Sequence, residues 1–449
     1  MADNSKFPGV LIILMAKVKA DDPGNLLIRS QFGDWPHDSL AQIHATGDAQ
    51  GHGEFCRRNY CLQECDRLFG RIFQLLRGAV VEMVALDRIE KQVNIHTDGL
   101  LWRWARTIKK RFGDWLINSG LWELIFRVRL SKSMVQFVED FKPDLIYCQG
   151  YSLGFATLPL LIGRRCGIPI CFQTTDDWPS YTYRGAFMGW LLRRSAQQLV
   201  ATSSVRVVFG QKMQREYERR YGVQFEATYH LDDPQRFSSV PCIQVQPLRI
   251  VYTGSLILRR YEALLDLLDV VRSLQDRIQP LEIVVYCTGL PKDIPQELLN
   301  SPEVKFFPLP THEELPRVLA SASILFLPES FNIASEMIEY AISSKSHLYM
   351  MSKRPILVYG PRSSGTVGYA IDGGWAEVVA IRNCDLLKQS LWKLLHDCER
   401  HVELNRRALE CVRNNHDLVA GRERFRKSLL AIVRSAPCSE NIEKAMKVS

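Results

Sequence analysis

Two positively charged side chains follow apolar, strand-like segments of this sequence, at places where a ligand can be held. The segment Ile250–Leu256 is typical of a buried strand that ends in a loop of small residues, including Gly254 and Ser255, and Arg260 follows it. Lys345 lies in a polar turn that precedes another apolar strand. In an open parallel sheet, ligands bind beyond the carboxyl ends of the strands. The pattern therefore predicts an anion site, and the anion we expect is a diphosphate.

A pair of carboxylates follows a third strand. Asp176 and Asp177 come directly after the apolar segment 169–173 and precede Trp178. At a strand end that faces a cleft, a carboxylate can orient a substrate or accept a proton. The alternative is that an aspartate here only caps the next helix. The sequence does not decide between these roles, or between the two aspartates.

Three further residues are weaker candidates. Gly24 and Asn25 close the loop after the first strand, where they either approach a ligand or simply form a turn. Glu329 follows the strand expected at 324–327 and either contacts ligand hydroxyls or caps the next segment.

A metal site is not expected. One cluster of metal-ligating residue types is present, formed by His52, Cys56, Cys61 and Cys65. It lacks the paired C-x2-C spacing of structural zinc sites. We interpret it as a helix with incidental cysteines.

Length and composition favour a cytosolic protein of two domains. The 449 residues are too many for one ordinary core, and 46% hydrophobic and 24% charged residues are typical of a globular protein. The first apolar run is short, as in a buried strand, and no run is long enough to span a bilayer. The net charge of +8 favours acidic partners, such as phosphorylated substrates or an anionic membrane, and no nucleic-acid-binding motif is present.

Strands and helices alternate along most of the chain, which predicts an α/β fold with parallel, doubly wound sheets. A long polar loop is expected at 19–53, followed by helices, and a linker at 230–247. Helices are expected at 153–166, 211–221 and 261–274, and through most of 384–433. Strands are expected near residues 144–149, 169–173, 201–209, 250–255, 282–289, 304–307, 324–327, 355–359 and 377–380.

Five segments, in their order and spacing, resemble GT-B glycosyltransferases of the retaining, family-4-like kind used in bacterial polysaccharide assembly. The segments are PDLIYCQGYS (143–152), TTDDWPS (174–180), IVYTGSLILRRY (250–261), ASASILFLPESF (320–331) and SKRPILVYGP (352–361). In addition, residues 25–43 resemble the acceptor-side loop of a subset of these enzymes.

The resemblance implies two Rossmann-like domains that face a cleft: residues 1–238 on the acceptor side, with a returning helix at 425–449, and residues 248–424 binding the nucleotide sugar. It implies transfer of a sugar from a nucleotide diphosphate sugar to a glycan or lipid-linked acceptor, with retention. Arg260 and Lys345 match the family residues that hold the donor diphosphate. The chain has no D-x-D motif, so we expect these cations, and no metal cofactor, to stabilise the leaving group.

The sequence departs from the family pattern at Leu348, where a glutamate usually binds the ribose hydroxyls. Leucine cannot accept these hydrogen bonds, and losing one costs on the order of 1.5–3 kcal/mol. Either Glu336 or Glu339 replaces the contact, or donor binding is weakened. Two alternatives to a transferase therefore stay open: a degenerate GT-B binding or scaffold protein, and a sugar-nucleotide epimerase.

The segment 100–130 is rich in tryptophan and basic residues, with four tryptophans, seven basic and two acidic side chains. Such a segment can lie in an anionic membrane interface, which suits a lipid-linked acceptor and a peripheral location on the inner face of a membrane. The alternative is an ordinary helix whose aromatic face packs on the sheet.

Overall fold

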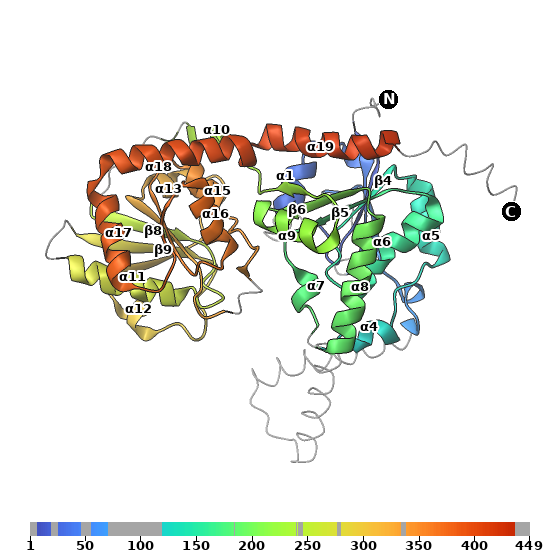
Figure 1. Ribbon diagram of the computed structural model, residues 1–449, viewed down its shortest axis with the longest axis horizontal. Coiled ribbons are helices and arrows are strands. Elements are labelled where there is room, and N and C mark those ends of the chain that lie inside the picture. Colours follow the sequence, from blue (N-terminus) through green and yellow to red (C-terminus); the bar gives the residue numbers. More distant parts are fainter. Residues whose placement is uncertain are drawn as a thin grey trace, which may run out of the picture.

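The chain forms two α/β units that lie side by side and are joined by a long helical path along one edge (Figure 1). The computed structural model describes residues 7–18, 26–45, 55–70, 119–183, 185–238, 240, 246–275, 280–333 and 338–435. Each unit has one parallel sheet with helices packed against it, as the alternation of strands and helices predicts.

The N-terminal unit contains a seven-stranded sheet in the order β3-β2-β1-β4-β5-β6-β7. Its strands are β1 (Val10–Ile13), β2 (Leu40–His44), β3 (Arg58–Cys61), β4 (Leu145–Cys148), β5 (Ile170–Thr174), β6 (Val205–Phe209) and β7 (Glu226–Thr228). Its helices are α1 (Leu26–Phe32), α4 (Leu121–Ile125), α5 (Lys132–Phe141), α6 (Leu153–Cys166), α7 (Trp178–Tyr181), α8 (Ala186–Thr202) and α9 (Gln211–Tyr221). The short helix α10 (Gln235–Ser238) lies on the C-terminal unit, where Phe237 packs in the core of that unit (Figure 1).

The C-terminal unit contains a six-stranded sheet in the order β10-β9-β8-β11-β12-β13. Its strands are β8 (Leu248–Thr253), β9 (Leu281–Cys287), β10 (Val304–Pro308), β11 (Ile324–Pro328), β12 (Ile356–Tyr359) and β13 (Glu377–Val379). Its helices are α11 (Tyr261–Leu274), α12 (Gln296–Asn300), α13 (Leu315–Ala320), α15 (Ser346–Met351), α16 (Gly365–Gly373), α17 (Cys384–His396) and α18 (Cys398–Cys411).

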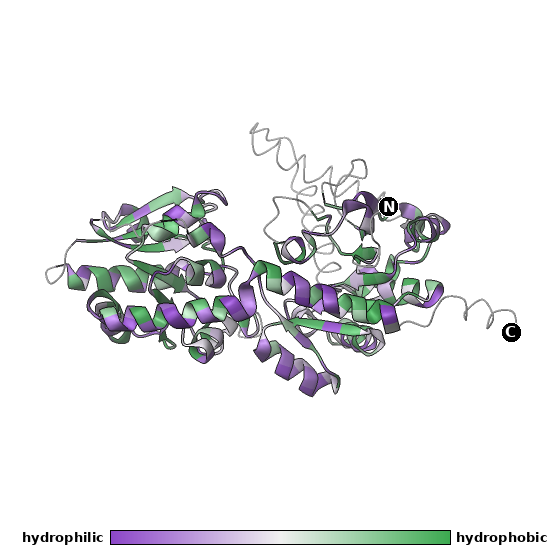
Figure 2. Ribbon diagram, turned by 90° about the horizontal axis from the view of Figure 1, so that it is seen from above, coloured by the Kyte–Doolittle hydropathy of each residue, from purple (hydrophilic) through white to green (hydrophobic). Residues whose placement is uncertain are grey.

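The central strands are buried on both faces, which is why they are continuous apolar runs rather than alternating ones. All residues of β1, β4 and β11 are buried. Seen from above, the strands are mainly hydrophobic, whereas the outer helices alternate between hydrophobic and hydrophilic faces (Figure 2). Helix α6 begins where Ser152 accepts a hydrogen bond from the Phe155 amide and ends at Gly167, so its predicted bounds are confirmed.

Two predictions for the first seventy residues are wrong. The loop expected at 19–53 contains α1 and β2, and the cysteine-bearing helix is instead the edge strand β3 followed by a short 3-10 turn. Strand β2 contains the buried polar residues Gln42 and His44, which obscure its strand pattern. The Gln42 side chain accepts from the Val18 amide and donates to the Ala16 carbonyl, so tertiary contacts satisfy it.

The chain returns from the C-terminal unit to the N-terminal one along its last helices. After α18 comes a π-helical turn, Val412–His416, and then α19 (Leu418–Ser435), which lies over the N-terminal unit (Figure 1). Phe425 and Leu429 pack in the same buried cluster as Phe32 of α1. The return predicted from the resemblance at about residue 425 is therefore complete by Leu418. None of the helices in the described part of the chain is long and apolar enough to cross a bilayer.

Three buried histidine rings lie where the chain crosses between the units. His347 of α15 stacks between His230 and His416, with ring centroids 5.6 and 5.5 Å away. His416 Nδ1 contacts the His230 carbonyl oxygen at 2.7 Å. Burial lowers the pKa of His230 to about 3 and that of His416 to about 4, and burial together with the two neighbouring rings lowers the pKa of His347. All three rings are therefore neutral at pH 7.

This stack should make the protein sensitive to mild acid. In the unfolded chain these histidines bind protons below about pH 6.5, whereas in the folded protein they bind protons only at a much lower pH. The free energy of unfolding should therefore fall as the pH drops below about 6.5. Each ring can contribute roughly 1 kcal/mol per pH unit. The thermal unfolding midpoint should therefore be lower at pH 5.5 than at pH 7.5.

A matched pair of variants separates this effect from other titrations. His347→Phe keeps an aromatic ring, and the Nε2 atom that the substitution removes has no hydrogen-bond partner. The unfolding midpoint of this variant should therefore fall less between pH 7.5 and pH 5.5 than that of the wild type. His396→Gln changes an exposed histidine and should leave the loss unchanged. An equal pH dependence in the wild type and in His347→Phe would contradict the prediction.

Candidate active site

The ends of neighbouring strands in the C-terminal sheet bring the predicted anion-site residues together. Strand β11 pairs with both β8 and β12, so the loops that carry Gly254, Glu329 and Gly360 are adjacent. Helix α15, which follows Lys345, leads back into the same sheet at β12. Sequence reasoning therefore placed Arg260 and Lys345 at a common edge, and the structure brings them together there.

Gly254 makes room for Lys345. Its φ of +139° is unfavourable for residues with a side chain, and a Cβ atom at this position would lie 1.9 Å from Lys345 Cε. Leu258 and Arg259 in the same loop also have positive φ, at 61° and 57°. Such conformations in non-glycine residues cost about 1–3 kcal/mol and concentrate at functional sites.

The Lys345 ammonium group is partly buried in a cationic environment. It lies 5.6 Å from the centroid of the Tyr252 ring, and no carboxylate of the described residues forms an ion pair with it. Burial and then the charge of Arg260 lower the pKa of Lys345 to about 8, while Glu329 acts in the opposite direction. Lys345 is therefore largely charged at pH 7, and a bound anion would stabilise that charge further.

Arg260 is held by a buried carboxylate. Its Nη2 and Nε atoms donate to Glu329 Oε2 at 3.0 and 3.3 Å, and Thr366 Oγ1 donates to Glu329 Oε1 at 2.7 Å. Glu329 is 3% exposed. Glu329 thus orients Arg260 in this structure. Ser255 has a local role as well, because its carbonyl accepts a hydrogen bond from Tyr252 Oη at 2.6 Å.

The two aspartates of the N-terminal unit have different environments. Asp177 is buried and bound by Arg220 through both carboxylate oxygens, at 2.7 and 3.0 Å, and by Tyr217 and Ser180. This carboxylate is saturated with protein donors, which favours a structural role. The ion pair ties the loop to α9.

Asp176 is less constrained. It accepts a hydrogen bond from Tyr151 Oη at 3.0 Å and a longer one from Thr175 at 3.4 Å. Burial raises the pKa of the Asp176 carboxyl, against these two hydrogen bonds. A carboxyl whose pKa moves toward neutrality suits proton transfer or contacts to hydroxyls. Of the two aspartates, the geometry favours Asp176 for chemistry.

The remaining predicted residues are placed as follows. Gly24, Asn25 and Glu336 lie outside the described residues. Leu348 packs against the hydrophobic core of the C-terminal unit, which gives its side chain a packing role. The Glu339 Oε1 atom lies 3.7 Å from the Nζ atom of Lys212 in the N-terminal unit. Among the described residues, no three His, Cys, Asp or Glu side chains are arranged so that they could hold a metal ion, and His52 of the cysteine cluster lies outside these residues.

Sequence reasoning missed two residues that organise this site. Thr366 binds Glu329 and also accepts a hydrogen bond from the Ser343 amide at 2.9 Å. Lys212 Nζ donates to the carbonyls of Glu339 and Ser363, both at 3.1 Å, and so links the two units. A signal for Lys212 was present, because it follows Gly210 at the end of a predicted strand.

Comparisons with known proteins agree with this architecture. Residues 76–228 match a family model described as a glycosyl transferase 4-like domain. A comparison with curated protein sequences gives no match. The fold is that of GT-B glycosyltransferases, and residues 76–228 are similar to a glycosyl transferase 4-like domain, so both findings agree with the resemblance seen in the sequence.

Solved structures that are similar to this chain share its fold at low sequence identity. Anabaena HepE in complex with UDP and glucose has 11% identity and a TM-score of 0.56, covering 94% of this chain and 99% of that one. Sucrose-phosphate synthase from Thermosynechococcus elongatus has 12% identity and a TM-score of 0.58, covering 95% and 99%. A glycosyltransferase from Rickettsia africae has 10% identity and a TM-score of 0.59, covering 96% and 100%.

The close contact between Gly254 and Lys345 can be tested by a double-mutant cycle. Gly254→Ala should destabilise the protein by about 1–3 kcal/mol, because it adds a clash with Lys345 to an unfavourable φ. Combining it with Lys345→Ala should recover part of that loss, since the clash is removed. Chemical denaturation of the four proteins measures the coupling.

Gly222→Ala provides the matched control. Gly222 also has a positive φ, +68°, but a Cβ atom there meets nothing within 4 Å. It should cost less than Gly254→Ala, and its effect should add to that of Lys345→Ala. Simple additivity for Gly254→Ala as well would mean that the two residues do not compete for space.

Proposed function

We propose that this glycosyltransferase moves a sugar from a nucleotide diphosphate sugar to a glycan or lipid-linked acceptor, with retention. The observation that carries the proposal is the pair of cations, Arg260 and Lys345, at adjacent strand ends. Among the described residues, Glu329 pairs with Arg260 and no carboxylate pairs with Lys345. The site therefore has an excess of positive charge. A departing nucleoside diphosphate carries the complementary charge, and its stabilisation lowers the barrier to transfer.

Each residue has a distinct role in this proposal. Lys345 and Arg260 bind the donor diphosphate, and Gly254 and Ser255 shape the loop beneath it. Glu329 keeps Arg260 in position through the ion pair at 3.0 Å. Asp176, from the opposite unit, contacts the transferred sugar or accepts the proton of the acceptor hydroxyl.

The nucleotide base can be identified by binding. The Anabaena HepE structures contain UDP and UDP-glucose, which makes UDP the first ligand to test, beside GDP, ADP and dTDP. At 100-fold its dissociation constant, a ligand of the native state adds about 2.7 kcal/mol of stability. One nucleotide should raise the unfolding midpoint of the wild type and fail to do so in Lys345→Met.

The same measurement has a control and a pH arm. Lys388→Met, on the outer helix α17, should keep the full shift. Because the Lys345 pKa is about 8, nucleotide affinity should fall as pH rises above that value, and Lys345→Met should lack this dependence. If none of the four nucleotides shifts the wild type, the degenerate scaffold becomes the better interpretation, with Leu348 in place of the ribose-binding glutamate as its cause.

We also propose that the N-terminal unit contacts an anionic membrane through the surface formed by α4 and the start of α8. Most of the segment 100–130 lies outside the described residues, but its described end includes α4, where Ile125 is 45% exposed. Phe187 and Trp190 at the start of α8 are 60% and 49% exposed and stack with ring centroids 6.3 Å apart. Arg194 lies over the Trp190 ring, so the aromatic surface has cationic neighbours.

Membrane contact predicts co-sedimentation with anionic vesicles. The full chain should sediment with phosphatidylglycerol vesicles at low salt and be released at high salt, because screening weakens the attraction. Phe187→Ser combined with Trp190→Ser should reduce sedimentation. The control is Leu290→Ser, which changes an exposed leucine of the C-terminal unit and should leave sedimentation unchanged. Sedimentation that is absent at low salt would refute the proposal.

A further inference from the structure

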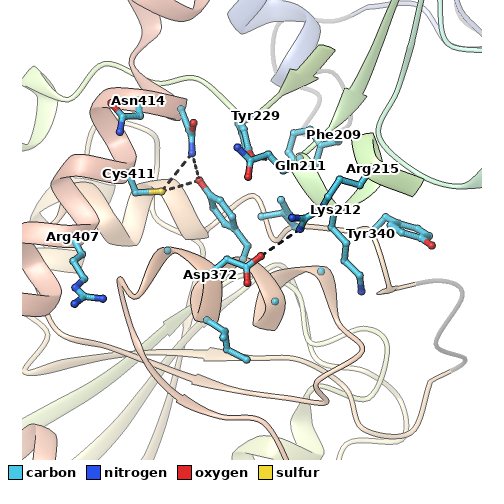
Figure 3. Close-up of a pocket in the computed structure, with 18 of the residues that line it drawn as sticks. Phe209, Gln211, Lys212, Arg215, Tyr229, Tyr340, Asp372, Arg407, Cys411 and Asn414 are labelled. Atoms are coloured by element: carbon cyan, nitrogen blue, oxygen red, sulfur yellow. Dashed lines mark hydrogen bonds and ion pairs between the residues drawn. The ribbon is translucent and has the colours of Figure 1, made fainter. Parts of the chain in front are cut away.

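A cavity lies between the two units, beside the passages by which the chain crosses from one unit to the other (Figure 3). Its volume is about 570 Å³, within the usual range of small-molecule sites. One wall is the end of β6 and the start of α9, a second is α16, and a third is formed by the end of α18 and the π-helical turn. Arg260, Glu329, Lys345 and Asp176 do not line it. We call it the flank cavity.

The rim of the flank cavity is cationic. Five basic and two acidic side chains are among its lining residues. The basic ones come from both units: Lys212, Arg215, Arg362, Arg406 and Arg407. The cavity therefore favours a ligand with negative charge.

Three of the rim cations already have carboxylate partners: Lys212 pairs with Glu339, and Arg406 and Arg407 both pair with Glu403. Arg215 and Asp372 approach to 3.7 Å, and both side chains are 68% exposed, so this pair is weak and a ligand can replace it. Arg362 forms no ion pair with a carboxylate of the described residues. The first turn of α9, beginning at Gln211, adds the positive end of a helix dipole at the same wall. Arg215 and Arg362 are therefore the cations that are most available to a ligand.

The floor of the cavity is aromatic and rigid. The rings of Tyr229 and Tyr369, one from each side of the crossing, stack with centroids 5.2 Å apart. The hydroxyl of Tyr369 is held by His416 Nε2 at 2.8 Å and by Asn415 Nδ2 at 3.0 Å. Tyr229 is buried beneath this stack, so the partly exposed Tyr369 ring provides most of the apolar surface, at little entropic cost because the ring is already fixed.

Groups that can bind hydroxyls surround this floor. The Asp372 carboxylate and the amides of Gln211 and Asn414 project around the cavity in Figure 3. Carboxylates and amides accept or donate several hydrogen bonds each, which suits a ligand with many hydroxyl groups. A cationic rim, an aromatic floor and hydroxyl-binding groups are thus combined in one cavity.

We propose that the flank cavity binds a sugar phosphate, with its phosphate at Arg215 and Arg362 and its sugar beside the Tyr229 and Tyr369 rings. This site is separate from the one proposed for the donor, and its existence does not depend on the donor being a nucleotide sugar. Because its walls belong to both units, a bound sugar phosphate holds them in one relative orientation.

Calorimetric titration of the full chain tests the proposal, with glucose 6-phosphate as the probe and glucose, inorganic phosphate and UMP as comparisons, all at 0.15 M salt. Glucose 6-phosphate should bind at least tenfold more tightly than either glucose or phosphate alone. The affinity should fall at least tenfold in Arg215→Gln combined with Arg362→Gln. It should be unchanged in Arg413→Gln, an exposed arginine of the π-helical turn that does not line the cavity.

Lys345→Met separates this site from the donor site. Glucose 6-phosphate should bind to Lys345→Met as it binds to the wild type, even if every nucleotide fails to bind. Three results would overturn the proposal: no binding of glucose 6-phosphate, binding that persists in the Arg215/Arg362 variant, or tighter binding of UMP than of glucose 6-phosphate through the same arginines. The last result would mean that the cavity holds a nucleotide instead.

Discussion

At the strand ends of the C-terminal sheet, the two cations Arg260 and Lys345 lie near one carboxylate, Glu329, among the described residues. The organisation of the candidate site follows from this excess of positive charge. Glu329 forms an ion pair with Arg260 at 3.0 Å. Lys345 is therefore partly buried beside the positive charge of Arg260 and has no ion-pair partner among the described residues. Its lowered pKa is the expected consequence of burial and repulsion. Such an arrangement is held by the fold rather than by its own attractions. Gly254, whose missing side chain leaves space for Lys345, is part of that support.

We propose that this charge imbalance takes the place of a metal ion in the reaction. A divalent ion would supply positive charge for a leaving diphosphate, and here two side chains supply it from fixed positions. Fixed charges need no reorganisation when negative charge develops on the ligand. The arrangement lowers the stability of the ligand-free protein, because Lys345 is partly desolvated and no carboxylate of the described residues pairs with it.

The sequence predicted the strands of the second half well because they are short apolar runs between turn signals. It placed Arg260 and Lys345 at one edge of the sheet because each lies in a loop beside such a run. It failed where tertiary contacts override local pattern. Strand β2 was missed because Gln42 is buried with its amide satisfied by residues 16 and 18. The sequence also could not separate Asp176 from Asp177. Only the fold shows that Arg220, far along the chain, saturates Asp177.

The crossing between the two units constrains how they can move. The chain passes from one unit to the other twice, and the two passages are hydrogen-bonded to each other: the Asp232 amide donates to the His416 carbonyl at 3.0 Å, and the Leu418 amide donates to the Asp232 carbonyl at 3.1 Å. Buried neutral histidines pack beside them. These hydrogen bonds hold the two passages together, because separating them would leave backbone groups without partners.

At the periphery of the interface between the units, the contacts are polar and partly exposed. The contacts of Lys212 with Glu339 and Ser363, and the weak pair of Arg215 with Asp372, lie in that zone. The first turn of α16 lies there too, and its Thr366 holds Glu329. One hydrogen bond and one ion pair, from Thr366 to Glu329 and from Glu329 to Arg260, therefore connect this interface to the charged site.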